Sequence, residues 1–204
     1  MSQENVYHFS LATGRLKEQA IQLHHERYVE VGFFEKNETD PYQNFSTYFT
    51  SQTGDDSKVV GVIRLISKKL DELPTIQNFT IYDIEKARLH QLDKTRYAEI
   101  SAFTKMPQHD VGLGLIKTAL QYSLDCGISH WICCIDERAY NYMHRMFKFP
   151  FKTVGVTQVY LGSISIPCTL NLKECLDTLQ ETRPQLYDYL TTLSEEKKQL
   201  EVVR

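Results

Sequence analysis

The chain has 204 residues, of which 42% are hydrophobic and 24% are charged, and its formal net charge is −3. This length supports one large core or at most two small ones, and we expect one domain. The charge gives no excess of lysine and arginine for a general nucleic-acid surface. Residues 1–17 lack the apolar run of a signal peptide, and no stretch approaches the roughly 18 apolar residues of a membrane span. We therefore expect a soluble, cytoplasmic protein.

The first part of the chain has the pattern of a helix followed by an antiparallel hairpin. Residues 14–31 carry apolar side chains at helical spacing. Residues 45–51 alternate as a strand, and the turn residues after them lead into an apolar strand at 59–66. Arg64 lies at the centre of this second strand, where burial of an unpaired charge would be costly.

A second charge lies at the centre of the next predicted strand. Residues 67–95 have no clean period, and residues 81–92 are the best helix candidate within that excursion. The strand at 96–104 then places Glu99 centrally on one of its faces. Burying either charge without a partner would cost on the order of several kcal/mol of desolvation free energy. We therefore expect Arg64 and Glu99 to face each other or a bound ligand, which indicates a candidate functional site.

A βαβ unit is predicted next. A helix opens at Gly112 and Gly114 directly after the strand of Glu99, and an apolar strand at residues 129–136 follows that helix. The two strands of such a unit are parallel. The start of the helix offers backbone N–H groups and the positive end of the helix dipole to an anion such as a phosphate. A plain helix start explains the two glycines equally simply.

The rest of the chain predicts one more helix, two more strands and a helical end. The helix covers residues 137–147, and the strands cover 153–161 and 163–172. We divide the chain into a domain at residues 1–182 and a charged helical tail at 183–204, which either packs on the domain or contacts a partner.

The cysteines and histidines do not indicate a disulfide framework or a metal site. The five cysteines are odd in number and include the adjacent pair Cys133 and Cys134, as expected for reduced structural thiols. The seven histidines show no ligand spacing with cysteines or carboxylates, so no metal is predicted.

The order of charged strand, glycine-bearing helix, strand and helix resembles the GNAT acyltransferase superfamily. More narrowly, it resembles the branch of N-acyl-homoserine lactone synthases and N-acyl amino acid synthases. The resemblance covers roughly residues 14–172, and it implies a mixed α/β fold with a mostly antiparallel central sheet, one parallel βαβ unit and flanking helices. It is carried by Arg27, by Glu-Thr-Asp-Pro-Tyr at residues 38–42, by Gly-Val-Ile-Arg-Leu at 61–65 and by Glu-Ile-Ser-Ala-Phe at 99–103.

In that branch, an acyl group passes from a thioester on acyl carrier protein or coenzyme A to a primary amine. The resemblance makes Glu99 the general base, and chemistry agrees because an ammonium must lose a proton before it attacks a thioester. It also makes Arg27, Asp40 and Arg64 the charged lining of the acceptor pocket. We expect Arg27 or Arg64 to clamp an acceptor carboxylate.

The second half of the Glu99 strand is expected to bind the reacting carbonyl. If this strand bulges as it does in the family, backbone N–H groups between Ser101 and Thr104 stabilise the tetrahedral oxyanion. We therefore include Ser101 among the catalytic residues and Phe103 among the substrate-binding residues.

The donor is expected at the start of the following helix. The resemblance assigns binding of the phosphopantetheine thioester to Gly112, Gly114 and His109, the last standing where the superfamily has Gln or Arg. His144 has the spacing from Phe149 of the superfamily tyrosine that protonates the leaving thiolate, although a surface histidine fits as well. An acidic carrier protein would be steered to a basic patch, which a solvated helix face explains equally. That patch is formed by Arg138, Arg145, Lys148 and Lys152.

Departures from the family pattern keep other functions open. Ala102 stands where the lactone synthases have an arginine, and Gln43 stands where they have a second carboxylate. Because a sulfonium such as S-adenosylmethionine favours aromatic faces and carboxylates, the preferred acceptor is an amino acid or a similar small amine, acylated with a fatty chain. The alternatives are a lactone synthase with an altered pocket, a short-chain N-acetyltransferase, and a catalytically silent module that binds acyl groups or carrier protein.

Each charged candidate also has a purely structural interpretation. Arg64 and Glu99 would form an ion pair inside the sheet. Arg27 would extend from the helix end to solvent, and Asp40 would be a turn residue before Pro41.

Overall fold

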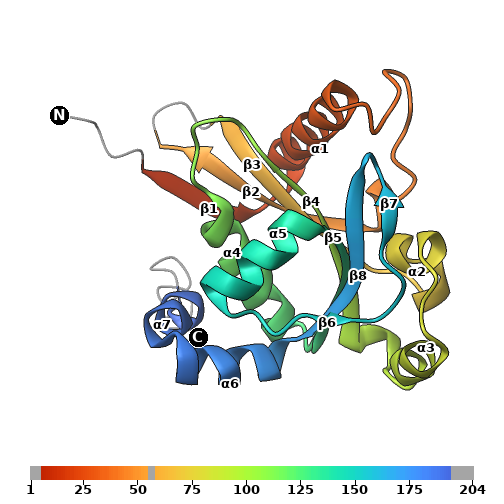
Figure 1. Cartoon of the computed structure of the whole chain (residues 1–204). Helices are drawn as coiled ribbons and strands as arrows, with labels where there is room; N and C mark the ends of the chain where they lie inside the picture. Colours follow the sequence, from red (N-terminus) through yellow and green to blue (C-terminus); the bar gives the residue numbers. More distant parts are fainter. Residues whose placement is uncertain (1–5, 55–57, 194–204) are drawn as a thin grey trace.

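A computed structural model describes residues 6–54 and 58–193 (Figure 1). One mixed sheet has the strand order β1-β2-β3-β4-β5-β8-β6, and β7 pairs with β8. The strands are β1 (Tyr7–Leu11), β2 (Ser46–Thr53), β3 (Val59–Ile66), β4 (Tyr97–Lys105), β5 (His130–Asp136), β6 (Lys152–Thr153), β7 (Gln158–Tyr160) and β8 (Ser163–Asn171). The helices are α1 (Gly14–Glu30), α2 (Pro74–Asn78), α3 (Asp83–His90), α4 (Gly112–Asp125), α5 (Glu137–Tyr142), α6 (Leu172–Thr182) and α7 (Pro184–Thr191).

Helices cover both faces of the sheet. Ala20 of α1 packs with Tyr48 and Val62 on one face, whereas Leu115 of α4 packs with Ile63 in the main core on the other. Every residue of β3 is buried, because this strand lies between the two layers. A strand covered on both faces has a continuous apolar run instead of alternation, which is why Arg64 stands out in this sequence.

The sheet divides at the middle of β4. The parallel pairing of β4 with β5 extends only over Tyr97–Glu99, opposite His130–Ile132. Beyond Glu99, β4 continues against β3, while β5 continues against β8. The two strands therefore diverge at Glu99, and we call this divergence the fork.

A bulge on β4 follows the fork. The register pairs Arg64 with Ser101 but Val62 with Thr104, so β4 contains one extra residue in this interval. Ala102 adopts a φ of 55° at that point, a left-handed conformation that is uncommon for a residue other than glycine. The bulge expected between Ser101 and Thr104 is confirmed.

The predicted fold class is confirmed: the sheet is mostly antiparallel, the hairpin of β2 and β3 is antiparallel, and β4, α4 and β5 form a parallel βαβ unit. The predicted helix at residues 137–147 is confirmed: α5 covers its first half, and a π-helical turn at Met143–Phe147 continues it. The predicted strand at 153–161 is wrong in part. The backbone of Val154 and Val156 bonds to residues 80–82 instead, which separates β6 from β7.

The end of the described chain packs against the domain. Leu190 of α7 is 1% exposed and belongs to the main core. The side chain of Gln121 on α4 donates hydrogen bonds to the carbonyls of Leu190 and Thr192 at 3.2 and 2.9 Å. Residues 194–204 of the predicted tail lie outside the described residues, and the domain boundary stays a prediction.

Candidate active site

Glu99 is buried at the fork and held by one residue. Its side chain lies on β4 and is 1% exposed. The carboxylate accepts hydrogen bonds from the Thr75 backbone N–H at 2.9 and 3.1 Å and from Thr75 Oγ1 at 2.8 Å. Burial raises the pKa of Glu99 to about 7, although the bonds from Thr75 and the charge of Arg64 oppose this rise. A carboxyl group with this pKa suits general base catalysis at neutral pH.

Arg64 bonds to Asp40 and not to Glu99. The register places Glu99 opposite Ile66, whereas Arg64 lies opposite Ser101. Arg64 Nη1 donates a short hydrogen bond to Asp40 Oδ2, and Arg64 Nε donates to Ser101 Oγ at 2.9 Å. The prediction that Arg64 faces Glu99 directly is therefore wrong. Asp40, from the loop before β2, neutralises the guanidinium instead.

Asp40, Arg64 and His24 form a buried polar cluster, together with Tyr48. Asp40 and Arg64 are 7% and 5% exposed, and Tyr48 OH accepts a further bond from Arg64 Nη1 at 3.3 Å. Burial alone would raise the pKa of Asp40, but its contacts with His24, Arg64 and the Tyr42 N–H lower this pKa to about 2. Asp40 is therefore ionised at neutral pH and is more than a turn residue.

Uncharged polar side chains gather at the fork. Burial raises the pKa of Tyr28 and Tyr160 to about 12, and that of Cys134 also to about 12. Tyr160 interacts electrostatically with Glu99, Tyr42 and Cys134, so these groups lie in the same part of the fold. At neutral pH these phenols and this thiol are uncharged, in the same part of the fold as Glu99 and the Asp40–Arg64 pair.

Sequence reasoning missed several residues that build the site. They are His24, Tyr28, Thr75, Cys134 and Tyr160. A detectable signal existed for His24, which follows Ala20 by one helical turn on the buried face of α1. The contact of Thr75 with Glu99 has no comparable local signal.

At the start of α4, both glycines lie against aromatic rings, and the approach is closest at Gly114. A Cβ on Gly112 would lie 3.1 Å from the Phe103 ring, and a Cβ on Gly114 would lie 2.2 Å from the Phe9 ring. Phe103 is 50% exposed beside this helix start. His109 lies close by, where its Nδ1 bonds with Tyr7 OH at 3.0 Å. The first turn of α4 contains no acidic residue, so its N–H groups are compatible with an anionic ligand.

A family model described as N-acyl amino acid synthase FeeM matches residues 19–171. The chain belongs to the FeeM N-acyl amino acid synthase family. It is an acyltransferase, which confirms the resemblance stated from the sequence. No curated protein sequence matches this chain significantly.

Solved structures support the fold of this FeeM-family enzyme. FeeM, an N-acyl amino acid synthase from uncultured soil microbes, has a TM-score of 0.66 and 16% identity over 89% of this chain and 99% of its own. The AHL synthase LasI has a TM-score of 0.62 and 15% identity over 83% and 91%. BjaI, a CoA-dependent acyl-homoserine lactone synthase with SAM and isopentyl-CoA, has a TM-score of 0.62 and 18% identity over 94% and 92%.

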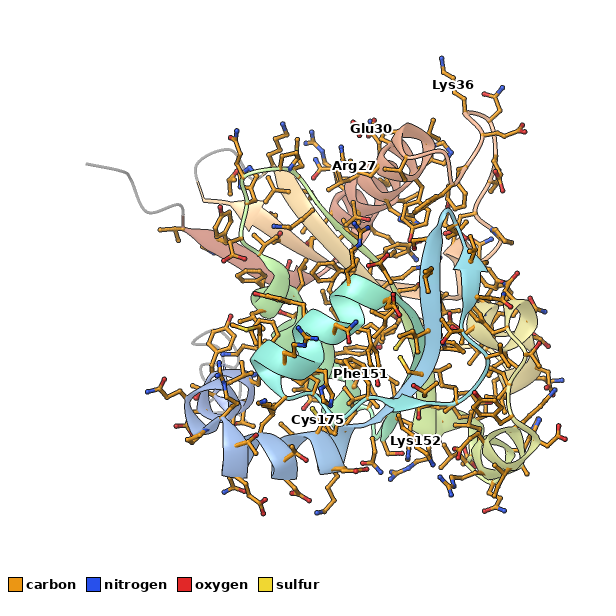
Figure 2. All side chains as sticks on the ribbon, in the orientation of Figure 1. Arg27, Glu30, Lys36, Phe151, Lys152 and Cys175 are labelled. Carbon is orange, nitrogen blue, oxygen red and sulfur yellow. The ribbon has the colours of Figure 1, made fainter. Side chains whose placement is uncertain are left out.

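Arg27 of this FeeM-family protein does not join the buried cluster. It forms a short ion pair with Glu30 one turn further along α1, and its side chain is 31% exposed. Figure 2 shows both residues on α1, far from Lys152. The residue of α1 that reaches Asp40 is His24, whose Nε2 lies 3.6 Å from Asp40 Oδ2.

The predicted basic patch is divided in this FeeM-family protein. Lys152 bonds to Glu85 of α3 at 2.8 Å, and Arg138 bonds to Asp136 at 3.4 Å. Arg145 and Lys148 are exposed in and directly after the π turn. His144 is exposed in the same turn and stacks on Tyr140 with ring centroids 6.3 Å apart.

Within residues 6–54 and 58–193, no cluster of three or more His, Cys, Asp or Glu side chains is arranged to hold a metal ion. In the same residues, no helix is long and apolar enough to cross a membrane.

Replacing Gly114 with alanine is expected to destabilise the enzyme, because the new methyl group would overlap the Phe9 ring at 2.2 Å. Thermal unfolding measures the effect, and we expect a lower Tm for Gly114→Ala. Adding Phe9→Leu should restore most of the loss by removing the ring. If Phe9→Leu gives no recovery, the glycine is required for another reason, such as close approach of a ligand to the backbone.

Proposed function

We propose that this enzyme transfers a fatty acyl group from a thioester on acyl carrier protein or coenzyme A to the amine of an amino acid or a similar small acceptor. The observation that carries this proposal is the position of Glu99, a carboxyl group with a pKa of about 7 at the fork, next to the bulge of β4. The family description, N-acyl amino acid synthase, supports the amino acid as acceptor.

The reaction follows from these positions. Glu99 takes a proton from the acceptor ammonium, and the free amine attacks the thioester carbon. Backbone N–H groups at the bulge around Ala102 stabilise the tetrahedral oxyanion. As the intermediate collapses to an amide, the nitrogen gives up its second proton to solvent and the departing thiolate takes up one proton to give a thiol, so the net release is the single proton taken by Glu99. His144 is our candidate for this last proton donor.

The charges at the site favour an amino acid over a sulfonium acceptor. Asp40 is already paired with Arg64, so its carboxylate is neutralised before any cation binds. Arg64 donates through Nε and Nη1 to protein atoms and has further N–H groups in its guanidinium for an acceptor carboxylate. A carboxylate-bearing amine fits this arrangement better than S-adenosylmethionine.

The experiment that tests the proposal combines the purified enzyme with dodecanoyl thioesters of acyl carrier protein and of coenzyme A. The twenty standard amino acids and S-adenosylmethionine serve as separate acceptors, and mass spectrometry detects N-dodecanoyl products. We expect a product with at least one amino acid and one equivalent of released thiol. If enzyme with bound thioester yields no amide with any acceptor, the proposal is wrong. Lactone formed only from S-adenosylmethionine would instead favour a lactone synthase.

We infer further that carrier protein docks on the exposed turn after α5. Arg145 and Lys148 lie there beside Tyr142 and Met146, which are 56% and 48% exposed. Basic and apolar side chains together suit the acidic surface of a carrier protein.

The charge reversal Arg145→Glu is expected to raise the KM for acyl carrier protein about tenfold, because the new carboxylate repels the acidic surface of the carrier protein. A tenfold change corresponds to about 1.4 kcal/mol of binding free energy. The KM for acyl-CoA should change little. Steady-state kinetics with both donors measures this, and Arg15→Glu on the exposed side of α1 is the matched control. Equal effects on both donors would contradict docking at this turn.

A further inference from the structure

The buried polar cluster contains one side chain without a hydrogen bond. His24 is 1% exposed, and among residues 6–54 and 58–193 neither of its ring nitrogens has a hydrogen-bond partner. Nε2 lies 3.6 Å from Asp40 Oδ2, slightly beyond hydrogen-bonding distance. A buried polar group without a partner is unfavourable and requires an explanation.

The groups around His24 define the charge of the cluster. Tyr28, one turn along α1, packs against the imidazole with ring centroids 4.0 Å apart, and His25 is adjacent in sequence. Asp40 approaches from the loop before β2, and Tyr48 and Arg64 follow from β2 and β3. Burial lowers the pKa of His24, while burial raises the pKa of Tyr28 and Tyr48. The imidazole and both phenols are therefore neutral, and Asp40 cancels Arg64.

A ligand carboxylate that binds to Arg64 would disturb this balance. It brings a second negative charge next to Asp40 in a buried site, and one guanidinium then serves two carboxylates. Burying a charge without a counter-charge is strongly unfavourable. His24 is the group of this cluster that can add a positive charge by gaining a proton, and its Nε2 already lies 3.6 Å from Asp40 Oδ2.

We propose that His24 is a positioning residue that takes up one proton when a carboxylate of the acceptor or of the N-acyl product binds at Arg64. The proton comes from solvent. The imidazolium then donates from Nε2 to Asp40, and N–H groups of Arg64 bond to the ligand carboxylate. His24 and Arg64 balance Asp40 and the ligand, so the occupied site is neutral again. This inference rests on the proposed function and assigns a carboxylate to the acceptor.

The test uses two product analogues that differ in a single charge. N-dodecanoylglycine carries the carboxylate, and N-dodecanoylglycinamide does not. Isothermal titration calorimetry at pH 7 in buffers of different ionisation enthalpy counts the protons taken up with each analogue. His24→Gln keeps a polar side chain that cannot be protonated, and His25→Gln on the same helix is the matched control. Circular dichroism confirms that both variants are folded.

We expect the unmodified enzyme and His25→Gln to take up about one proton with N-dodecanoylglycine and none with the amide. His24→Gln should take up none and should bind the acid at least tenfold more weakly, with unchanged affinity for the amide. Equal proton uptake by His24→Gln and the unmodified enzyme would overturn the inference, and so would the absence of uptake in the unmodified enzyme.

A second measurement uses the unmodified enzyme, so its result does not depend on whether His24→Gln folds. In enzyme labelled with ¹⁵N-histidine, the ring nitrogen shifts of one buried histidine should change from imidazole to imidazolium when N-dodecanoylglycine is added. No such change with saturating acid would contradict the inference. The proposed function fails separately: transfer assays without any amide product would exclude it even if His24 is protonated, whereas transfer without protonation would exclude only the role of His24.

Discussion

Replacing Glu99 with glutamine is expected to lower the rate of acyl transfer roughly 10²- to 10⁴-fold, because the amide cannot accept the ammonium proton. The fold should persist, since glutamine keeps an oxygen that can accept the bonds from Thr75. In the unmodified enzyme, kcat/KM should rise with pH through about 7 as Glu99 ionises. Glu99→Gln should lose this limb of the profile.

A donor-binding assay shows whether Glu99→Gln has lost only the proton acceptor or has also lost the binding site for the thioester. Glu99→Gln should bind acyl thioesters with the affinity of the unmodified enzyme in a direct binding assay. Glu72→Gln, which changes an exposed carboxylate paired with Lys68, is the matched control and should retain full activity. A Glu99→Gln enzyme with more than a tenth of the original rate would exclude Glu99 as the base.

The same substitution has an expected signature in stability. The pKa of Glu99 rises from 4.5 in the unfolded chain to about 7 in the folded enzyme, so the folded state holds the proton more tightly between these values. The free energy of unfolding of the unmodified enzyme therefore decreases as pH rises from about 4.5 to about 7. Glu99→Gln lacks this loss, and the difference in Tm between the two should widen over this range.

Replacing Asp40 with asparagine is expected to destabilise the enzyme by about 3–5 kcal/mol, because Arg64 is left buried without its counter-charge. Both side chains are 6% exposed, so solvent does little to screen the change. Urea denaturation measures the loss in the free energy of unfolding.

The double variant Asp40→Asn with Arg64→Met tests the reason for the loss. It removes both charges, and we expect it to be more stable than Asp40→Asn alone. A double variant that is no more stable than the single variant would show that the uncompensated charge of Arg64 is not the cause. Transfer activity should be low in both, because each lacks the charged pair beside the fork.

Local pattern was sufficient to place Glu99 and the strand order around it. The alternation of β4, the glycines that open α4 and the apolar run of β5 together predicted the parallel unit, whereas the parting of its strands at Glu99 is visible only in the structure. Short-range periodicity determines which residues share a face of one strand. It does not determine which residues from other elements complete the site.

The partner of Arg64 shows this limit. Asp40 and Glu99 both carry a carboxylate that could pair with the Arg64 guanidinium, and charge alone does not decide between them. The choice depends on the bulge at Ala102, which places Ser101 opposite Arg64, and on the loop that brings Asp40 beneath α1. Neither the bulge nor the path of that loop is encoded in a periodic pattern.

The inner face of α1 could not be chosen by spacing. Leu23 follows Ala20 by three residues, and Arg27 follows Leu23 by four. His24 follows Ala20 by four residues, and Tyr28 follows His24 by four. Both sets fit one side of a helix. Packing against the sheet buries Ala20 and His24 and leaves Arg27 with Glu30 near the surface, so the buried face is rotated by about one residue from the face that Leu23 and Arg27 share.

The early parting of β4 and β5 has a consequence for how this enzyme can diversify. Glu99 and the charged cluster are held by β2, β3, β4, α1 and the loop before β2, whereas the other side of the fork is formed by β5, by β8 that pairs with it and by β7 that pairs with β8. In the proposed reaction, we expect substitutions in the second group to change how an acyl chain is accommodated without displacing Glu99 or Arg64. For the function proposed above, we therefore expect chain-length preference and chemical competence to be separable by substitution in this fold.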